Sequence, residues 1–141
     1  MQGEASQKNI FKKIAHAGLS TKARLFFAQD FFQSQIARWL LLLSAVANLA
    51  DWIALKIFIK PVDFPIILHY NVFFGVDTLG DWKETFYLPS IGLILLLING
   101  RLALQLYKKK ERIAGYLMLM AALMIQLSLL VASTSIIIIN Y

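Results

Sequence analysis

The side chains that could do chemistry fall into two groups, one inside apolar segments and one between them. The first group is a carboxylate and three amides: Asp51, Asn48, Asn99 and Gln126. A carboxylate within a segment that crosses a bilayer costs about 2.5 kcal/mol or more if it is unpaired, so it is by default a candidate functional residue. Asp51 is therefore a candidate proton or cation site, or an anchor for a ligand.

Structural roles compete with this functional interpretation. Asp51 is then neutral, or it bonds one of the neighbours that the sequence offers: a serine, Asn48, Lys56 or Trp82. A single carboxylate also does not form a proton path. An amide that faces another helix can bond to it, with a gain of about 0.6 to 2 kcal/mol per contact. The three amides are therefore expected to hold helices together.

The second group of polar side chains lies in the stretch from residue 61 to residue 89. It consists of one histidine, one amide and two acids: His69, Asn71, Asp77 and Asp81. A metal site needs three or four such ligands to converge, and these are scattered. The alternative is an aromatic plug over helix ends, in which polar atoms cap turns. With no cysteine, no serine–histidine–acid pattern and no glycine-rich phosphate loop, we expect no enzymatic activity, cofactor or metal.

Three apolar segments are long enough to position these residues across a bilayer. The chain is 59% hydrophobic and only 16% charged, against about 25% charged in a typical soluble domain. The apolar segments run from about 36 to 59, from 86 to 106 and from 113 to 139, and about 20 residues suffice to cross a bilayer. The sequence predicts an all-α membrane protein whose residues 36–141 form a three-span domain.

The N-terminal part, residues 1–35, is expected to be a tail followed by an amphipathic helix at the membrane surface. Basic residues stand beside clustered phenylalanines there, which suits a helix in the headgroup layer. A soluble amphipathic helix docked on a partner is the alternative. The small residues Ala45 to Ala47 are similar to a signal-peptide cleavage site, but the apolar segment resumes after them and favours a span.

The outer segment, residues 60–85, is expected to be a short hairpin or an extended cap. Residues 66–74 alternate with a period of two, and Gly75 and Gly80 break that pattern. Asp81 and Glu84 then have capping-box spacing, which predicts a helix start at Trp82. Pro89 falls inside that helix and should kink it.

Small and polar residues form a stripe on two of the spans. The first stripe is Ser44, Ala47, Asn48, Asp51 and Ala54, and the second is Gly115, Ala122, Gln126 and Ser133. Small residues at helical spacing allow helices to approach closely. We expect both stripes to face inward or toward an oligomer partner.

The distribution of basic residues predicts the orientation. Residues 1–38 carry six Lys or Arg and the connection at 101–112 carries five, whereas residues 60–84 carry two against four acids. Because short basic loops stay in the cytoplasm, the N-terminus should be cytoplasmic and the C-terminus extracytoplasmic, in a cell inner membrane. The basic segments should meet anionic lipid headgroups, and no nucleic-acid-binding fold accompanies them.

Part of the outer stretch resembles a known family. Pro65, His69, Asn71, Gly75 and Asp77, followed by Lys83 and Leu88-Pro89, resemble a segment of the SdpI-type bacterial membrane proteins. The match covers residues 61–89 and implies a bacterial inner-membrane immunity or signalling protein. The run HYNVFFGVDTLG also resembles uncharacterised three-span membrane proteins of small uncultured bacteria.

Three functions are compatible with these patterns. The first is a non-enzymatic membrane scaffold or accessory subunit, acting through its outer cap or small-residue faces on a second copy or another membrane protein. The second is a ligand-recognising immunity or signalling protein. The third is a small transport or proton-coupled component that uses Asp51.

Overall fold

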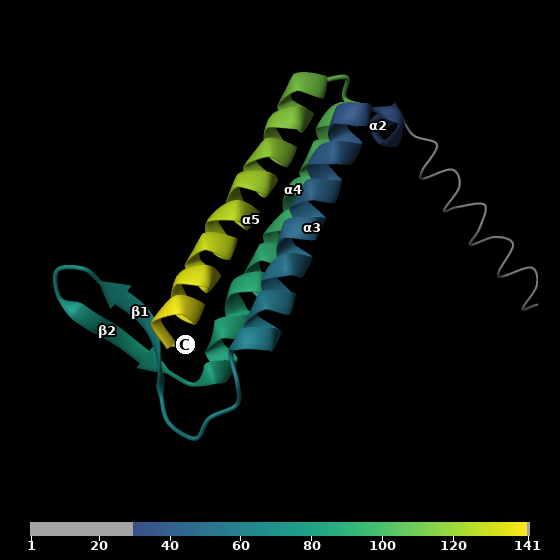
Figure 1. Cartoon of the computed structure of the whole chain (residues 1–141). Coiled ribbons are helices and arrows are strands. Elements are labelled where there is room, and N and C mark those ends of the chain that lie inside the picture. Colours follow the sequence, from purple (N-terminus) through teal and green to yellow (C-terminus); the bar gives the residue numbers. More distant parts are fainter. Residues whose placement is uncertain (1–29, 141) are drawn as a thin grey trace, which may run out of the picture. The chain divides into compact units, whose positions relative to one another are not determined.

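The computed structural model describes residues 30–140, and three long helices dominate it (Figure 1). They are α3 (Gln35–Phe58), α4 (Tyr87–Lys108) and α5 (Arg112–Asn140). A 3₁₀ turn, η1 (Trp82–Phe86), precedes α4. All three are long and apolar enough to cross a membrane, which confirms the number of predicted spans.

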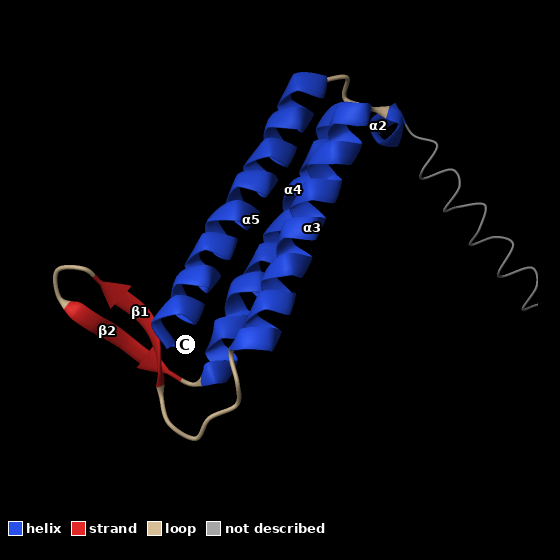
Figure 2. Cartoon of the chain, in the orientation of Figure 1, coloured by secondary structure: helices blue, strands red, loops and turns tan. Residues whose placement is uncertain are grey.

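The described residues belong to two compact units that divide between Gln35 and Ile36. The first unit is described only at its end, where α2 (Asp30–Gln33) forms one helical turn. The predicted amphipathic helix otherwise lies outside the described residues. The second unit contains the three long helices and a small two-stranded sheet (Figure 2).

The distribution of polarity in the second unit is the reverse of that in a soluble protein. Large apolar side chains are exposed along all three helices, among them Leu49, Ile53, Ile94, Leu97, Met124 and Val131. Six polar side chains are buried instead: Ser44, Asn48, Asp51, Thr85, Gln126 and Ser133. Because water does not solvate an apolar exterior favourably, this pattern indicates a lipid environment.

Helices α4 and α5 are the closely packed pair. A Cβ atom added to Gly115 would lie 3.2 Å from the carbonyl oxygen of Ala103, so the two backbones nearly touch. Ala103 and Ala122 are fully buried along the same contact. Such close backbone approaches are common between α4 and α5 and rare between α3 and either of them. The predicted stripe on α5 therefore faces inward.

The turn between α4 and α5 explains how they pack antiparallel. Glu111 N–H donates to the carbonyl of Leu106 at 3.0 Å, and Lys110 N–H donates to that of Tyr107 at 3.0 Å. These bonds form a Schellman motif, which normally places glycine in the left-handed position. Here that position is Lys110, with φ of 67°.

Strands β1 (Ile66–Asn71) and β2 (Gly75–Gly80) pair antiparallel as a hairpin. Residues 72–74 form its turn, and Gly75 has a φ of 80°, which L side chains rarely adopt. The hairpin alternative is thus confirmed. The strand was expected to continue to residue 74 and to be broken by Gly75. It ends at Asn71 instead, and Gly75 opens the second strand, because a three-residue turn needs a residue with positive φ at that point.

The base of the hairpin is fixed to the ends of the helices. Ile66 joins a buried cluster with Leu55 and Ile59 of the first span and Ile136 of the last. The Asn140 side chain accepts a hydrogen bond from Ile67 N–H at 2.9 Å and donates one to the Ile67 carbonyl at 2.7 Å. The base of the hairpin is therefore joined to α3 and α5 by apolar packing, and to α5 also by hydrogen bonds.

The predicted capping box at the start of η1 is present. Asp81 Oδ1 accepts from Lys83 N–H at 3.1 Å, and Glu84 Oε1 accepts from Asp81 N–H at 3.4 Å. The chain changes from 3₁₀ to α conformation at Tyr87, two residues before Pro89. A kink at Pro89 remains a prediction.

Candidate functional site

Two of the three predicted intramembrane amides meet at the centre of the helix bundle. Asn48 Nδ2 donates to Gln126 Oε1 at 3.0 Å and to the Pro89 carbonyl at 2.9 Å. Gln126 Nε2 donates to the Gly92 carbonyl at 2.7 Å. We call these four residues the amide cluster. It links α3, α4 and α5, and since Asn48 and Gln126 are 5% and 2% exposed, water does not compete with its bonds.

Gly92 provides the space that the amide cluster occupies. A Cβ atom there would lie 2.8 Å from Gln126 Oε1 and 3.0 Å from Asn48 Nδ2. Both distances are shorter than a normal contact between a methyl group and a polar atom. Any larger residue at position 92 would therefore displace one or both amides. Gly92 was not among the predicted site residues, although a glycine within an apolar helix is a recognisable signal of close approach.

Asn99 does not join the amide cluster. Its Nδ2 donates to the carbonyl of Leu95, one turn earlier in its own helix, at 3.0 Å. Such local bonds satisfy a polar side chain without a second helix. Among the hydrogen bonds of residues 30–140, none joins the Asn99 side chain to another helix.

Asp51 lies on the same face of α3 as Asn48 and is 1% exposed. Its carboxylate faces the hydroxyl of Ser133 on α5, which is fully buried. Within the described part of the chain, Asp51 Oδ1 and Ser133 Oγ have no partner at hydrogen-bonding geometry. A serine is among the neighbours that the sequence offered, and Ser133 lies beside Asp51. Because a hydroxyl beside a carboxylate can donate a hydrogen bond to it, Ser133 is the partner that the structure offers Asp51. A buried carboxylate with one such partner can still take up a proton or a small cation.

The polar residues of the hairpin form pairs and caps. His69 Nδ1 lies 2.7 Å from Asp77 Oδ1 and 2.9 Å from Oδ2, across the two strands. Asn71 Oδ1 accepts from Phe73 N–H at 2.9 Å within the turn. Asp81 caps η1, as described above. Among residues 30–140, no three His, Cys, Asp or Glu side chains gather as a metal site.

The turn of the hairpin carries an apolar tip, whose residues were not among the predicted site residues. Val72, Phe73 and Phe74 are 83%, 90% and 85% exposed, more than the large apolar residues on the helices. Turns usually contain glycine, proline and small polar residues because these fit the backbone geometry and bond to it. Three consecutive large apolar residues at a turn are therefore unexpected for a loop surrounded by water.

An aromatic group connects α3 to the start of α4 beside this hairpin. The rings of Trp52 and Phe86 lie 5.8 Å apart, and those of Trp82 and Phe86 lie 6.3 Å apart. With Lys56 these rings line an open groove of about 490 Å³. Tryptophan and lysine at the end of a span are typical of the boundary between lipid and water. The group therefore marks a membrane boundary at the hairpin end of the helices.

The inverted polarity, the length of the helices and this aromatic boundary together define the class: a multi-pass membrane protein, with three candidate spans among residues 30–140. Comparisons with family models, with curated proteins and with solved structures found no match to this chain.

Proposed function

We propose that this chain is a non-enzymatic scaffold or accessory subunit of a bacterial inner membrane, which presents its hairpin to a partner protein outside the cytoplasm. The observation that supports this proposal is the contrast between the two ends of the hairpin. The base is held by Asn140 and by the buried cluster around Ile66, whereas residues 69, 70 and 72–74 and residues 76–79 are exposed.

A fixed base favours binding because it reduces the entropy lost on association. A free hairpin of two short strands is marginally stable by itself in water. Here the two Asn140 bonds and the packing of Ile66 set the direction of the strands before a partner arrives. Pre-organisation of this kind raises affinity without adding contacts.

The exposed part of the strands offers a surface of mixed character. Tyr70 and Val76 are cross-strand partners and are 47% and 44% exposed. The pair of His69 and Asp77 lies next to them, with side chains 65% and 40% exposed. Aromatic and apolar groups beside polar ones are typical of interaction surfaces. The proposed contact surface is therefore the middle of the two strands.

Site-specific photocrosslinking in the membranes of the native cell tests this proposal. A photoreactive residue replaces Thr78, which is exposed on β2, and a control places it at Val131, which is exposed on α5. A single defined protein crosslinked at position 78 and not at 131 is expected. Loss of that product in a His69→Ala, Asp77→Ala variant identifies the surface. No product that depends on position 78 would refute the proposal.

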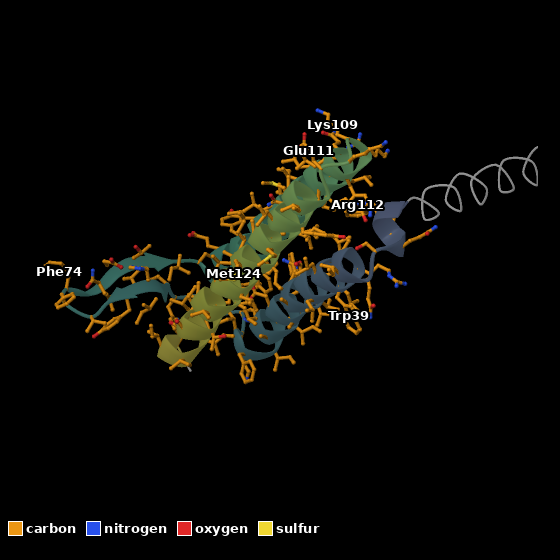
Figure 3. The ribbon with its side chains drawn as sticks, turned by 90° about the horizontal axis from the view of Figure 1, so that it is seen from above. Trp39, Phe74, Lys109, Glu111, Arg112 and Met124 are labelled. Atoms are coloured by element: carbon orange, nitrogen blue, oxygen red, sulfur yellow. The ribbon has the colours of Figure 1, made fainter. Side chains whose placement is uncertain are left out.

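The orientation in this proposal rests on charge. The turn between α4 and α5 carries Lys108, Lys109, Lys110 and Arg112 together at one end of the unit, and the hairpin lies at the other (Figure 3). Because basic loops are retained in the cytoplasm, this arrangement supports a hairpin outside the cytoplasm.

A second candidate function is favoured by Asp51 and Ser133. The burial of this carboxylate beside a single hydroxyl supports a proton or small-cation site within the membrane, as in a transport component. Ion flux into vesicles that contain the purified chain tests this function. Flux that is present in the native chain and lost in Asp51→Asn supports it, whereas equal flux in both, or none in either, counts against it.

A further inference from the structure

The apolar tip of the hairpin, Val72 to Phe74, is the most exposed group of large apolar residues in the described part of the chain. Monomeric soluble surfaces rarely leave such a contiguous group in water. The three residues are consecutive in one turn, so burying their side chains requires a surface that reaches the end of the hairpin.

The direction of the hairpin indicates which surface covers the apolar tip. Figures 1 and 3 show that the hairpin leaves the helices sideways, and that its turn lies level with the last turn of α5 along the helix axis. At 1.5 Å per residue, the 29 residues of α5 extend about 43 Å, against about 30 Å for the hydrocarbon core of a bilayer. The end of α5 therefore reaches the headgroup layer, and the apolar tip lies at the same level beside the helices.

The chemistry of the turn permits contact with lipid. Residues 70–76 carry no charged side chain, and the nearest acid, Asp77, is paired with His69. The N–H group of Phe73 is satisfied by the Asn71 side chain. A backbone group that already has a partner costs less to remove from water than an unsatisfied one.

We propose that the apolar tip inserts into the headgroup and acyl boundary of the membrane leaflet at the hairpin end of the helices. The lipid surface is continuous with the exposed apolar sides of α3, α4 and α5, so one bilayer covers both. The hairpin is then held at two points, by its base on the helices and by its tip in lipid. This inference goes beyond the proposed function and does not depend on a protein partner.

The absence of cysteine makes the test direct, because one introduced cysteine is the only labelling site. A Phe73→Cys variant is labelled with an environment-sensitive fluorophore and reconstituted at low density in vesicles of phosphatidylethanolamine and phosphatidylglycerol. Asp63→Cys, exposed in the loop before β1, is the control. A Phe74→Cys variant repeats the measurement at a second position of the tip, and circular dichroism checks that each variant keeps its helices.

The expected result is a blue-shifted emission at positions 73 and 74, with several-fold stronger quenching by headgroup-proximal spin-labelled lipid than at position 63. Water-like emission at both tip positions would overturn the proposal. A label that is shielded from water but not quenched by the lipid would also overturn it, and would indicate that a second copy of the chain covers the tip.

Discussion

Replacing Gly92 by alanine should destabilise the helix bundle, because the added methyl group meets the amide cluster. The new Cβ would lie 2.8 Å from Gln126 Oε1, 2.9 Å from Leu129 Cδ1 and 3.0 Å from Asn48 Nδ2. Forcing a methyl group into a filled site costs about 1 to 3 kcal/mol. Each interhelical hydrogen bond that is displaced costs about 0.6 kcal/mol more on average.

Alanine favours the helix more than glycine does, and this gain must be subtracted from the cost of the substitution. Glycine in a helix is about 1 kcal/mol less favourable than alanine in water. The net loss expected for Gly92→Ala is therefore about 2 kcal/mol, from displacement of one or both amides. The measurement is the free energy of unfolding in mixed micelles, followed by helix content as the denaturing detergent increases.

Gly100 provides a matched control on the same helix. A Cβ atom at that position would meet only Leu41 Cδ2, at an ordinary contact distance of 3.6 Å. Gly100→Ala should therefore be neutral or stabilising. Equal free energies of unfolding for the two alanine variants would refute the idea that the amide cluster limits position 92.

A double-mutant cycle tests the cause of the effect. In a Gln126→Ala background the closest atom to the new methyl group, Oε1, is gone. The cost of Gly92→Ala should then fall by about 1 kcal/mol, since residues in contact are not additive. An unchanged cost would mean that the destabilisation arises elsewhere.

Three further predictions concern the hairpin, the Schellman turn and the orientation. Asn140→Leu should lower the free energy of unfolding by about 1 to 2 kcal/mol and speed amide exchange in β1, since the Ile67 backbone loses both of its bonds to the Asn140 side chain. The control Thr134→Val removes only a bond to Leu130 of its own helix, and should leave amide exchange in β1 unchanged. Lys110→Gly should raise the free energy of unfolding by about 1 kcal/mol by relieving a left-handed residue, whereas Lys109→Gly, where φ is −79°, should not. A membrane-impermeant thiol reagent added to intact cells should label Asp63→Cys and leave Lys109→Cys unlabelled; the reverse pattern would contradict the proposed orientation.

The helices and caps were predictable because their signals are local. An apolar run of sufficient length fixes a span, and the spacing of Asp81 and Glu84 fixes a helix start, without knowledge of the rest of the chain. The hairpin was predictable only as one of two alternatives. An alternating segment forms a strand only when a second segment pairs with it, and here that pairing depends on residues 75–80 folding back along residues 66–71.

The composition of the amide cluster could not be predicted from sequence. Asn48, Asn99 and Gln126 look equivalent in a list of polar residues within spans, and which of them meet depends on how each helix is rotated about its axis. Asn99 proved to bond its own helix. Asn140 was also missed as a contact, because a residue at the very end of a helix finds its partner only in the folded hairpin.

The position of Asn48 in the chain has a consequence for biosynthesis. Its span enters the translocon before the other two described spans, since Asn48 precedes Pro89 by 41 residues and Gln126 by 78. Until those residues emerge from the ribosome, the Asn48 amide lacks the interhelical partners that it has in the folded bundle, and their stabilising hydrogen bonds cannot form. The nascent first helix is therefore best retained beside the translocon or a membrane insertase, and is released into lipid only after the last helix has been made.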